Sequence, residues 1–518
     1  MQCNWNEKKC KCAHLKRGKL FIEDVTLDDG FVLKCLDSFD LYKFLGVPEN
    51  IEHDVQSLSE KLIENIERRA NVTWSSPLSD YNKVISSNTF VNSTAEYFFW
   101  SEKFRIEDLK TMDINVRKAI VKNGAKHYQQ LNSVLYLPKN LGGRGLRTLE
   151  RTYKETKIKA AVNLLETNDA RMKLVRKFHY ICMKTKHASI FKDAMAYASE
   201  IGLTLRIDGE DSYEITVETN EGAETADSKA IKGLLQKKRN EQLESEVFGT
   251  TWQGLNFKQR KDDTNLHRGC YDWLKCWQNV PSYIVRDIYD LYCQTLNTKT
   301  FQLIRSEHPP ADTLCRLCKT GSESVNHILN RCSKLLTGPY TKRHDEALLC
   351  FFNELLFKLE LITTCPPWFS QTKPKPYYEN EVASVWWNVP EFAGASLEHD
   401  DDRILRPDGK IMLKAEKKIF IVEITISWID NRGTRYDDKV GKYAAIRRNV
   451  MREEPDYTVD QITLVMDSLG GFSKNLCENI GKIFDDSRVV DRIIRKMQKS
   501  VLSNSVHISR CFKLETQL

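Results

Sequence analysis

The chain has 518 residues, enough for roughly three to four domains that each bury a core of their own. Its hydrophobic fraction of 41% and charged fraction of 29% are ordinary for a globular protein. The sequence has no run of about 18 apolar residues, and its start, MQCNWNEKKCKC, is unlike a signal peptide. We therefore expect neither a membrane protein nor a secreted one, and we expect the 15 cysteines to be reduced in the nucleus or cytoplasm.

The net charge of +7 is unevenly distributed along the chain. Residues 101–190 contain 20 Lys or Arg against 8 Asp or Glu, a local balance of +12. Such an excess is the expected electrostatic footprint of binding to a phosphate backbone, although most basic runs are solvated helix faces. Within this region the predicted nucleic-acid-binding residues are Arg144, Arg147, Lys157 and Lys159.

Short strand-like runs such as KLFIEDV and FVLKCL predict the edge of a sheet in residues 1–50. Helical patterns dominate residues 51–205 and predict a basic helical domain. Between Ile207 and Ser228 there are eight acidic residues and no Lys or Arg, so we interpret residues 206–228 as an exposed linker or insertion. A second helical domain is expected in residues 229–310, where Trp and Tyr side chains should form a core rather than a platform for stacked bases.

A compact set of metal-binding residue types lies in residues 311–335, with the spacing C-x2-C-x8-H-x4-C. Three thiolates and one imidazole form the closed tetrahedral set that zinc favours. We therefore predict a structural zinc knuckle, because a complete set leaves no coordination position open for catalysis. The alternative is four unrelated buried residues. The predicted ligands are Cys315, Cys318, His327 and Cys332.

Residues 336–518 are predicted to form an α/β domain. The run GPYTKRHDEALLCFFNELLFKLEL predicts a helix with Arg343 and His344 near its start, where a phosphate can bind; a solvated first turn is the alternative. A proline-rich linker and a β-hairpin should follow. After them we expect a helix from Asp437, the strand TVDQITLVMDSLGG and a final helix that includes VVDRIIRKMQ.

The hairpin is the part of this domain whose chemistry can be argued residue by residue. In the run RPDGKIMLKAEKKIFIVEIT, Asp408 precedes the first arm and Glu423 lies on the second, so the two carboxylates are expected to face each other. Hard oxygen ligands of this kind suit magnesium or manganese. Lys439 and Tyr443 are four residues apart on one helix face that could point back at the carboxylates. The alternative is that Asp408 caps a turn and Glu423 lies on a solvated strand face.

Taken in order, these blocks resemble the C-terminal part of the polyprotein of non-LTR retrotransposons that carry a restriction-like endonuclease, the type whose members insert into ribosomal RNA genes. Each block is weak alone, but their order and spacing are specific and they span nearly the whole chain. The matching blocks are WNEKKCKCAHLKRGKL, YKFLGV, NTFVNSTAEYFFWSEKFRIEDLKTMDINVRK, LYLPKNLGGRGL, YKETKIKAA, the CCHC knuckle, YTKRHD and RPD followed by E, K and Y.

The resemblance implies a multidomain α+β protein. Its mostly helical N-terminal two-thirds would comprise the end of a reverse-transcriptase palm, a thumb and a linker, and its C-terminal domain would be a restriction-endonuclease-like fold. It implies that Asp408 and Glu423 hold magnesium, that Lys439 acts on the scissile phosphate or its water, and that Tyr443 supports that lysine or contacts the DNA backbone. The activity implied is nicking of target DNA, which provides the primer for copying element RNA. DNA, and element RNA as a second ligand, are the implied partners.

The chain departs from the family pattern at two places. Glu423 stands where many members have aspartate, which keeps the charge and lengthens the side chain. No aromatic-Ala-Asp-Asp sequence occurs, so we expect a truncated protein that does not extend a primer by itself, with Phe44, Leu45 and Gly46 as packing remnants of the palm. Two rival interpretations stay open: a non-catalytic nucleic-acid-binding remnant, and a fragment of a full reverse transcriptase.

Overall fold

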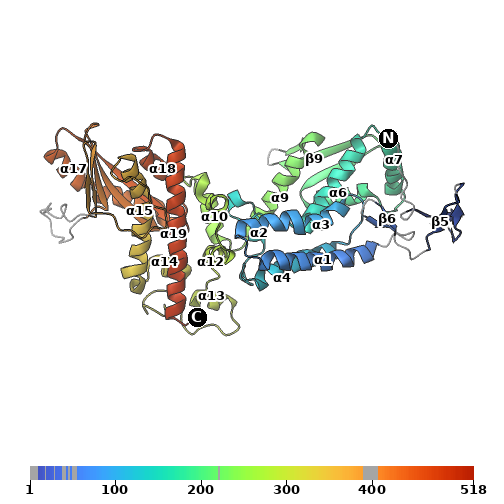
Figure 1. The fold of residues 1–518 in the computed structure, drawn as a ribbon, viewed down its shortest axis with the longest axis horizontal. Helices are drawn as coiled ribbons and strands as arrows, with labels where there is room; N and C mark the ends of the chain where they lie inside the picture. Colours follow the sequence, from blue (N-terminus) through green and yellow to red (C-terminus); the bar gives the residue numbers. More distant parts are fainter. Residues whose placement is uncertain are drawn as a thin grey trace. The chain divides into compact units, whose positions relative to one another are not determined.

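The structure is a computed structural model that describes residues 10–17, 19–28, 30–37, 42–44, 47–49, 55–219, 222–388 and 406–517. It confirms the mixed α+β class, with helices in the majority (Figure 1). The chain divides into two compact units. Unit 1 comprises Met1–Ser76, Ser86–Asn123 and Arg147–Arg239, and unit 2 comprises Pro77–Ile85, Gly124–Leu146 and Asn240–Leu518. The described residues include no helix with the length and apolar character needed to cross a membrane.

Unit 1 begins with short strands, as the sequence predicts for residues 1–50. β1 pairs in parallel with β5, β4 pairs with the other edge of β5, and two separate hairpins are formed by β2 with β3 and by β6 with β7. Leu45 and Gly46, predicted as palm remnants, lie outside the described residues. The strands are β1 (Lys11–Cys12), β2 (His14–Lys16), β3 (Lys19–Phe21), β4 (Val25–Thr26), β5 (Val32–Cys35), β6 (Tyr42–Phe44) and β7 (Val47–Glu49).

The helices of unit 1 follow the predicted apolar periodicity. In α1 the buried residues Leu58, Leu62, Ile66 and Ala70 recur every four positions, and this stripe packs against α4. Helix α6 packs against both α4 and α8. The helices are α1 (Val55–Ser75), α3 (Ser93–Glu96), α4 (Ile106–Lys122), α6 (Leu149–Glu166), α7 (Ala170–Lys184) and α8 (Ile190–Glu200).

The acidic segment of unit 1 is not an extended linker. A three-stranded antiparallel sheet forms from β8 (Leu203–Ile207), β9 (Tyr213–Thr219) and β10 (Gly222–Thr225). In β8 burial alternates strictly, because Leu203, Leu205 and Ile207 face the core that α6 and α8 share with the sheet. Of the two alternatives predicted for residues 206–228, a linker or an insertion, the strands formed by the described residues favour an insertion.

Unit 2 contains a helical part with a dense aromatic core. Trp273, Tyr289 and Tyr292 are almost fully buried. This confirms the prediction that these aromatic residues form a core and not an exposed platform for stacked bases. Helix α9 (Ile231–Phe248) crosses the boundary between the two units. The other helices of this part are α2 (Asp80–Ser86), α5 (Ser133–Tyr136), α10 (Leu255–Asp262), α11 (Trp273–Cys276), α12 (Ser282–Tyr292), α13 (Lys299–Arg305) and α14 (Val325–Asn330).

The C-terminal part of unit 2 is a five-stranded sheet in the order β11-β12-β13-β14-β15. The predicted hairpin is confirmed, because β13 and β14 pair antiparallel, and β14 pairs in parallel with β15. The parallel pair requires a crossover, which helices α16 and α17 supply. The strands are β11 (Tyr377–Glu379), β12 (Ala383–Trp387), β13 (Gly409–Leu413), β14 (Lys418–Ser427) and β15 (Thr458–Asp467).

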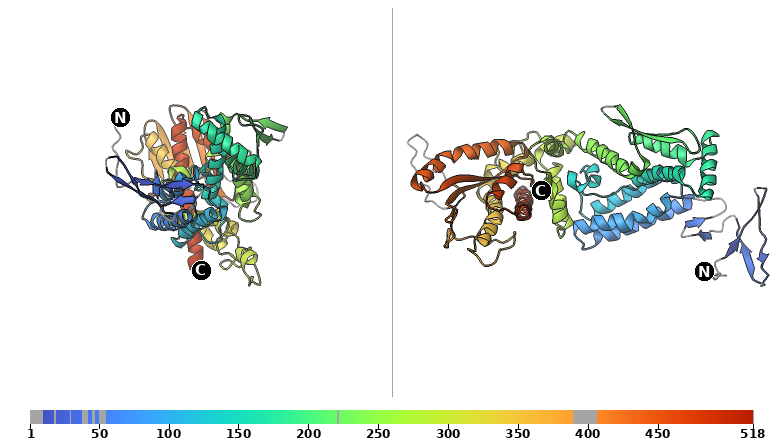
Figure 2. Two further views of the ribbon diagram at one scale, coloured as in Figure 1. Left: turned by 90° about the vertical axis from the view of Figure 1, so that its right-hand side faces the viewer. Right: turned by 90° about the horizontal axis from the view of Figure 1, so that it is seen from above.

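Helices cover both faces of this sheet (Figures 1 and 2). On one face α15 (Thr341–Lys358) packs against α19 (Ser487–Glu515), with α18 (Lys474–Gly481) beside them. On the other face Ile419 and Ile421 of β14 form a small core with Tyr443 and with residues of α17 (Ala444–Glu453). Helix α16 (Arg432–Lys442) packs against β14 and β15. The helix predicted from Asp437 begins earlier, at Arg432, and is interrupted at Tyr443. The predicted strand and final helix are confirmed as β15 and α19.

Candidate functional site

The two predicted carboxylates lie at the same end of the β-hairpin. Gly409 of β13 pairs with Val422 of β14, so the register extended by one residue places Asp408 opposite Glu423. One carboxylate oxygen of Asp408 accepts a hydrogen bond from the backbone N–H of Ile424 at 2.8 Å. This bond ties the residue before β13 to the strand that carries Glu423, and it fixes the orientation of the aspartate.

Helix α16 brings the predicted lysine to the pair. Lys439 forms an ion pair with Glu423, and its backbone carbonyl accepts a hydrogen bond at 3.0 Å from Gln461 of β15. Tyr443, at the break between α16 and α17, donates its hydroxyl hydrogen to the carbonyl of Arg406 at 3.0 Å. Lys439 therefore reaches Glu423 from α16, whereas Tyr443 lies just beyond that helix and its hydroxyl bonds to the segment that precedes Asp408.

Burial and charge give the two carboxyl groups different acidities. Burial and the nearby negative charge of Asp408 raise the pKa of Glu423 to about 7, although Lys439 opposes them. Burial alone would raise the pKa of Asp408, but the hydrogen bond and charge of His344, with the N–H of Ile424, outweigh it and lower that pKa. Two acidic groups whose pKa values are pushed apart are typical of a functional site.

The second carboxylate oxygen of Glu423 is an unsatisfied buried acceptor. Glu423 is only 2% exposed, and its Oε2 has no hydrogen-bond partner within the described part of the chain. Buried oxygens of this kind are uncommon, because a buried acceptor that lacks a hydrogen bond costs about 1–3 kcal/mol of stability. A divalent cation held between Glu423 and Asp408 would satisfy it, so the donor set fits magnesium or manganese chemistry.

His344 contacts the carboxylate pair, although the sequence pattern assigned it to a helix N-terminus that binds phosphate. Its Nε2 lies 3.3 Å from a carboxylate oxygen of Asp408, and its Nδ1 lies 3.0 Å from Asp345. Burial lowers its basicity, but these two carboxylates outweigh burial and raise the pKa of His344 to about 10. The imidazole is therefore a cation at neutral pH, and its charge favours the ionised form of Asp408. The only sequence signal for this role is the YTKRHD block itself.

Arg343 is not a phosphate ligand in this structure. Its side chain is buried, with one nitrogen donating to the carbonyl of Leu329 at 2.8 Å and another to the hydroxyl of Ser505 at 3.3 Å. Burial lowers the pKa of Arg343 to about 10, with Tyr340 acting in the opposite direction. A guanidinium enclosed in this way cannot reach a nucleic-acid backbone, so the predicted role of Arg343 is wrong and its function is to hold neighbouring elements.

The predicted knuckle residues converge on one point. The ligand atoms of the four residues all lie within 4.8 Å of one another, with the sulfurs of Cys315 and Cys332 4.0 Å apart and the Cys318 sulfur 3.2 Å from Nε2 of His327. Helix α14 presents His327, and the hydroxyl of Ser324 caps that helix by accepting from the His327 N–H. The cluster can hold a metal ion such as zinc.

The thiols of Cys318 and Cys332 in the cluster differ in acidity. Burial disfavours the Cys318 thiolate, but hydrogen bonds from Thr320 and Gly321 outweigh it and lower the pKa of Cys318 to about 5. Burial and the neighbouring cysteines raise the pKa of Cys332 to about 12. Binding of a cation favours the thiolate at both positions, as zinc coordination requires. Close packing also fixes the imidazole, since a Cβ on Gly321 would lie 2.6 Å from the ring of His327.

The four basic residues predicted to bind nucleic acid divide into two groups. Arg144 is 1% exposed and forms a buried ion pair with Asp80, and Lys157 is 4% exposed, with its pKa lowered by burial to about 8. The prediction that either side chain contacts the phosphate backbone of a nucleic acid directly is therefore wrong. Arg147 stays partly exposed beside Glu96, and Lys159 is half-buried. Only these two remain accessible to a phosphate.

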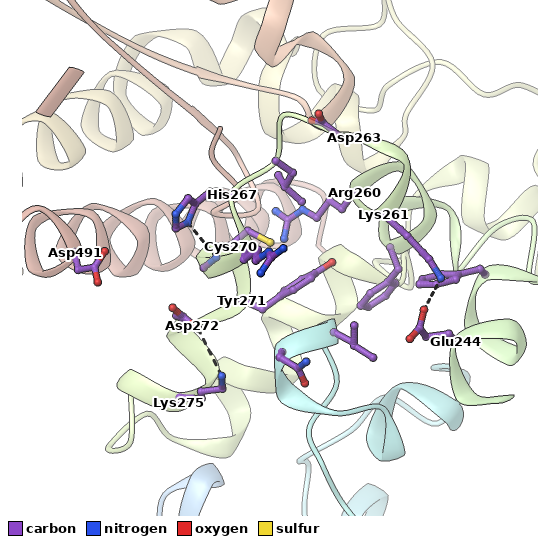
Figure 3. A pocket seen from close by; sticks show the side chains of 17 residues that line it. Glu244, Arg260, Lys261, Asp263, His267, Cys270, Tyr271, Asp272, Lys275 and Asp491 are labelled. Carbon is purple, nitrogen blue, oxygen red and sulfur yellow. Dashed lines mark hydrogen bonds and ion pairs between the residues drawn. The ribbon is translucent and has the colours of Figure 1, made fainter. Parts of the chain in front are cut away.

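Unit 2 also contains a pocket of about 650 Å³ (Figure 3). Its floor includes Tyr271 and Arg260, whose guanidinium lies 5.1 Å from the centre of the Tyr271 ring. Arg260 is already committed to a buried ion pair with Asp467 at 2.7 Å. None of the predicted site residues lines this pocket, and the basic side chains around it are matched by acidic ones. The pocket therefore gives no charge preference for a ligand.

Comparison of the chain with protein-family models and with the curated proteins finds no match.

Proposed function

We propose that this protein is a metal-dependent DNA endonuclease, of the kind that non-LTR retrotransposons use to nick their target. The observation that carries the proposal is the convergence of Asp408, Glu423 and Lys439 at one end of the β13–β14 hairpin. The buried Oε2 of Glu423, which accepts no hydrogen bond from the residues that the structure describes, adds a reason to expect a cation there.

In the proposed mechanism Asp408 and Glu423 hold magnesium or manganese. The ion would polarise a phosphodiester and lower the pKa of the attacking water. His344 and the N–H of Ile424 hold Asp408 in its ionised form. Lys439, which pairs with Glu423 in this structure, would stabilise the negative charge that develops on the phosphate. Tyr443 anchors the end of α16 through Arg406 and so keeps the lysine at the site.

We assign the Cys/His cluster to folding. A zinc ion held by three thiolates and one imidazole has no open position for a substrate, and its binding energy stabilises the surrounding structure. DNA is the proposed substrate and element RNA a proposed second ligand, with Arg147 and Lys159 as candidate phosphate contacts in unit 1. Such a protein would be nuclear or cytoplasmic, and it would act on DNA in the nucleus.

The test is nicking of supercoiled plasmid by the purified full chain with magnesium. Wild-type protein should convert the plasmid to the open circle, and Asp408→Ala should abolish conversion, because the remaining carboxylate cannot hold the cation alone. The matched control is Glu416→Ala, since Glu416 lies in the turn of the same hairpin and pairs only with exposed Lys418. Equal nicking by wild type and Asp408→Ala would dispose of the catalytic assignment.

A non-catalytic nucleic-acid-binding protein is the second candidate function. One observation favours it: Lys439 already neutralises Glu423, so the pair is balanced without a metal ion. In that case DNA binding would weaken steeply with salt, by a slope of about −0.9 in log K against log salt per phosphate contacted. Metal-independent binding without any nicking, under conditions where the protein is folded, would support this candidate over the nuclease.

A further inference from the structure

The residue just before α15, Tyr340, is bonded to the segment that carries two of the four ligands of the Cys/His cluster, His327 and Cys332. The hydroxyl of Tyr340 donates to the carbonyl of Ile328 at 2.6 Å and accepts from the backbone N–H of Cys332 at 3.1 Å. It also lies 3.3 Å from the carbonyl of His327. One hydroxyl therefore links the backbone of two of the four ligand residues, so their spacing and the position of Tyr340 depend on each other.

Arg343, three residues later, adds a second link to the same segment. It donates to the carbonyl of Leu329, which lies between the ligands His327 and Cys332, and contacts the side chain of Asn330 at 3.4 Å. Within the described residues it forms no ion pair, so its hydrogen bonds to the knuckle and to Ser505 of α19 are what compensate a buried charge. The start of α15 is thus anchored to the knuckle by two side chains.

His344 follows Arg343 directly and points to the other site. Its Nε2 lies 3.3 Å from Asp408, the residue whose other contact is the Ile424 N–H on β14. Because successive residues of an α-helix advance by about 1.5 Å and turn as a rigid unit, a shift of Arg343 must move His344 as well. The contacts form an unbroken chain from Cys332 through Tyr340, Arg343 and His344 to Asp408.

We propose that the first turn of α15 couples metal binding at the Cys/His cluster to the geometry of the carboxylate pair. Tyr340 and Arg343 are positioning residues on the cluster side, and His344 is the positioning residue for Asp408. The inference rests on the proposed function, because that function assigns the carboxylate pair its role. Loss of the metal removes the constraint that keeps His327 and Cys332 together, which releases Tyr340 and Arg343 and lets His344 withdraw from Asp408.

The first test measures hydrogen exchange of the peptide that contains the Ile424 amide, in the full chain with zinc bound and after chelation. Zinc removal should accelerate exchange of this amide about tenfold or more, because its acceptor on Asp408 becomes mobile. Chelation could also loosen all of unit 2, so variants are compared with zinc still bound. Tyr340→Phe and His344→Gln should each accelerate exchange at Ile424. The control Tyr457→Phe, which removes a hydroxyl without a hydrogen bond within the described chain, should not.

The second test uses zinc affinity, because coupling between two sites is reciprocal. Tyr340→Phe should weaken zinc binding about tenfold, the usual effect of removing an outer partner of a metal site. His344→Gln, which touches no cluster residue, should also speed zinc release, whereas Tyr457→Phe should leave it unchanged. A merely structural role for His344 predicts no change in zinc release.

The outcomes separate the coupling from the nuclease. If Ile424 exchange and zinc release respond as expected but no protein nicks DNA, the coupling holds and the proposed nuclease function is wrong. If the wild type nicks DNA with magnesium but Ile424 exchange is the same in wild type, Tyr340→Phe and His344→Gln, the coupling is overturned and the nuclease stands.

Discussion

At the scale of single residues, the most informative feature is how buried charges are paired. Asp408 and Glu423 share their end of the hairpin with two cations, His344 and Lys439, supplied from opposite faces of the sheet. The residue types of the pair could be predicted from sequence, because antiparallel arms place their side chains in register. The histidine could not, since it is far away in sequence and a helix N-terminus offered a simpler role. The burial of Arg343 and Arg144 could not be predicted either, because a count of charged residues does not show which side chains are exposed.

A buried network in unit 2 gives a prediction about stability. Asp467 is fully buried, forms ion pairs with Arg260 and Arg432, and accepts backbone hydrogen bonds from Leu469 and Gly471. Asp467→Ala should lower the free energy of unfolding of unit 2 by about 3–5 kcal/mol, because it removes a carboxylate that two buried arginines share. Among the described residues, Arg260 would keep only the neutral acceptors Tyr292 and Leu469, and Arg432 would keep only its ion pair with Asp263. Chemical denaturation followed by Trp fluorescence measures the change.

The matched control is Asp460→Ala in the same strand, β15. Asp460 pairs with Lys482, and both side chains are at least a third exposed, so its loss should change stability by no more than about 1 kcal/mol. Similar destabilisation by both variants would contradict the assigned importance of the buried network.

The same residue predicts a dependence on pH. Burial alone would raise the pKa of Asp467, but its pairs with Arg260 and Arg432 outweigh burial and lower that pKa. A group with a folded pKa below its unfolded value of about 3.9 contributes stability above that pH and loses it as the pH falls. Wild-type unfolding free energy should therefore fall more steeply than that of Asp467→Ala between about pH 5 and pH 3. Parallel pH profiles would be evidence against the ion pairs.

At the scale of elements, the local residue pattern predicted most helices and strands well, but it did not predict how distant elements assemble. The β13–β14 hairpin, β15 and α19 follow from apolar periodicity, whereas the early start of α16 falls in RGTRYDDKV, which has almost no apolar residues to mark a helix. Composition could not distinguish a linker from an insertion in the acidic segment, because polar residues alternate with apolar ones along its strand β9. The knuckle was predictable because its ligands are close in sequence and its helix is capped locally by Ser324.

The Cys/His cluster predicts a bound metal and a dependence of folding on it. The purified chain should contain about one zinc per molecule, and Cys315→Ser should lose it, because a tetrahedral site rarely tolerates the loss of a thiolate. Elemental analysis measures zinc, and the melting temperature of unit 2 should fall with it. Cys276→Ser, a cysteine outside the cluster, serves as control. Equal zinc content in both variants would exclude the assigned ligands.

At the scale of the whole molecule, the basic segment does not belong to a single unit. Residues 101–190 are divided between the two units, and two of the four predicted phosphate contacts are buried. Composition could predict that nucleic acid is a candidate partner but not which cations remain accessible, because burial depends on packing that no local pattern encodes. The mixed α+β class and the order of elements were the parts that the sequence could specify.

Nucleic-acid binding gives a prediction at this scale. Arg147→Ala and Lys159→Ala should each weaken binding to duplex DNA and reduce the salt slope by about 0.9, because each removes one phosphate contact. Fluorescence anisotropy over a range of salt concentrations gives both quantities. Lys157→Ala should leave the slope unchanged, since that ammonium is buried. A slope that falls for Lys157→Ala but not for the two accessible residues would reverse this assignment.

The most direct test of the central claim is a titration of the zinc-loaded full chain with Mn²⁺, followed by the paramagnetic signal of the free ion. We expect the wild type to bind one Mn²⁺ beyond the zinc cluster. This site should be lost in the double variant Asp408→Asn and Glu423→Gln and kept in Glu416→Gln. Mn²⁺ binding by the double variant that equals the wild type would contradict the claim that these two carboxylates share a divalent cation.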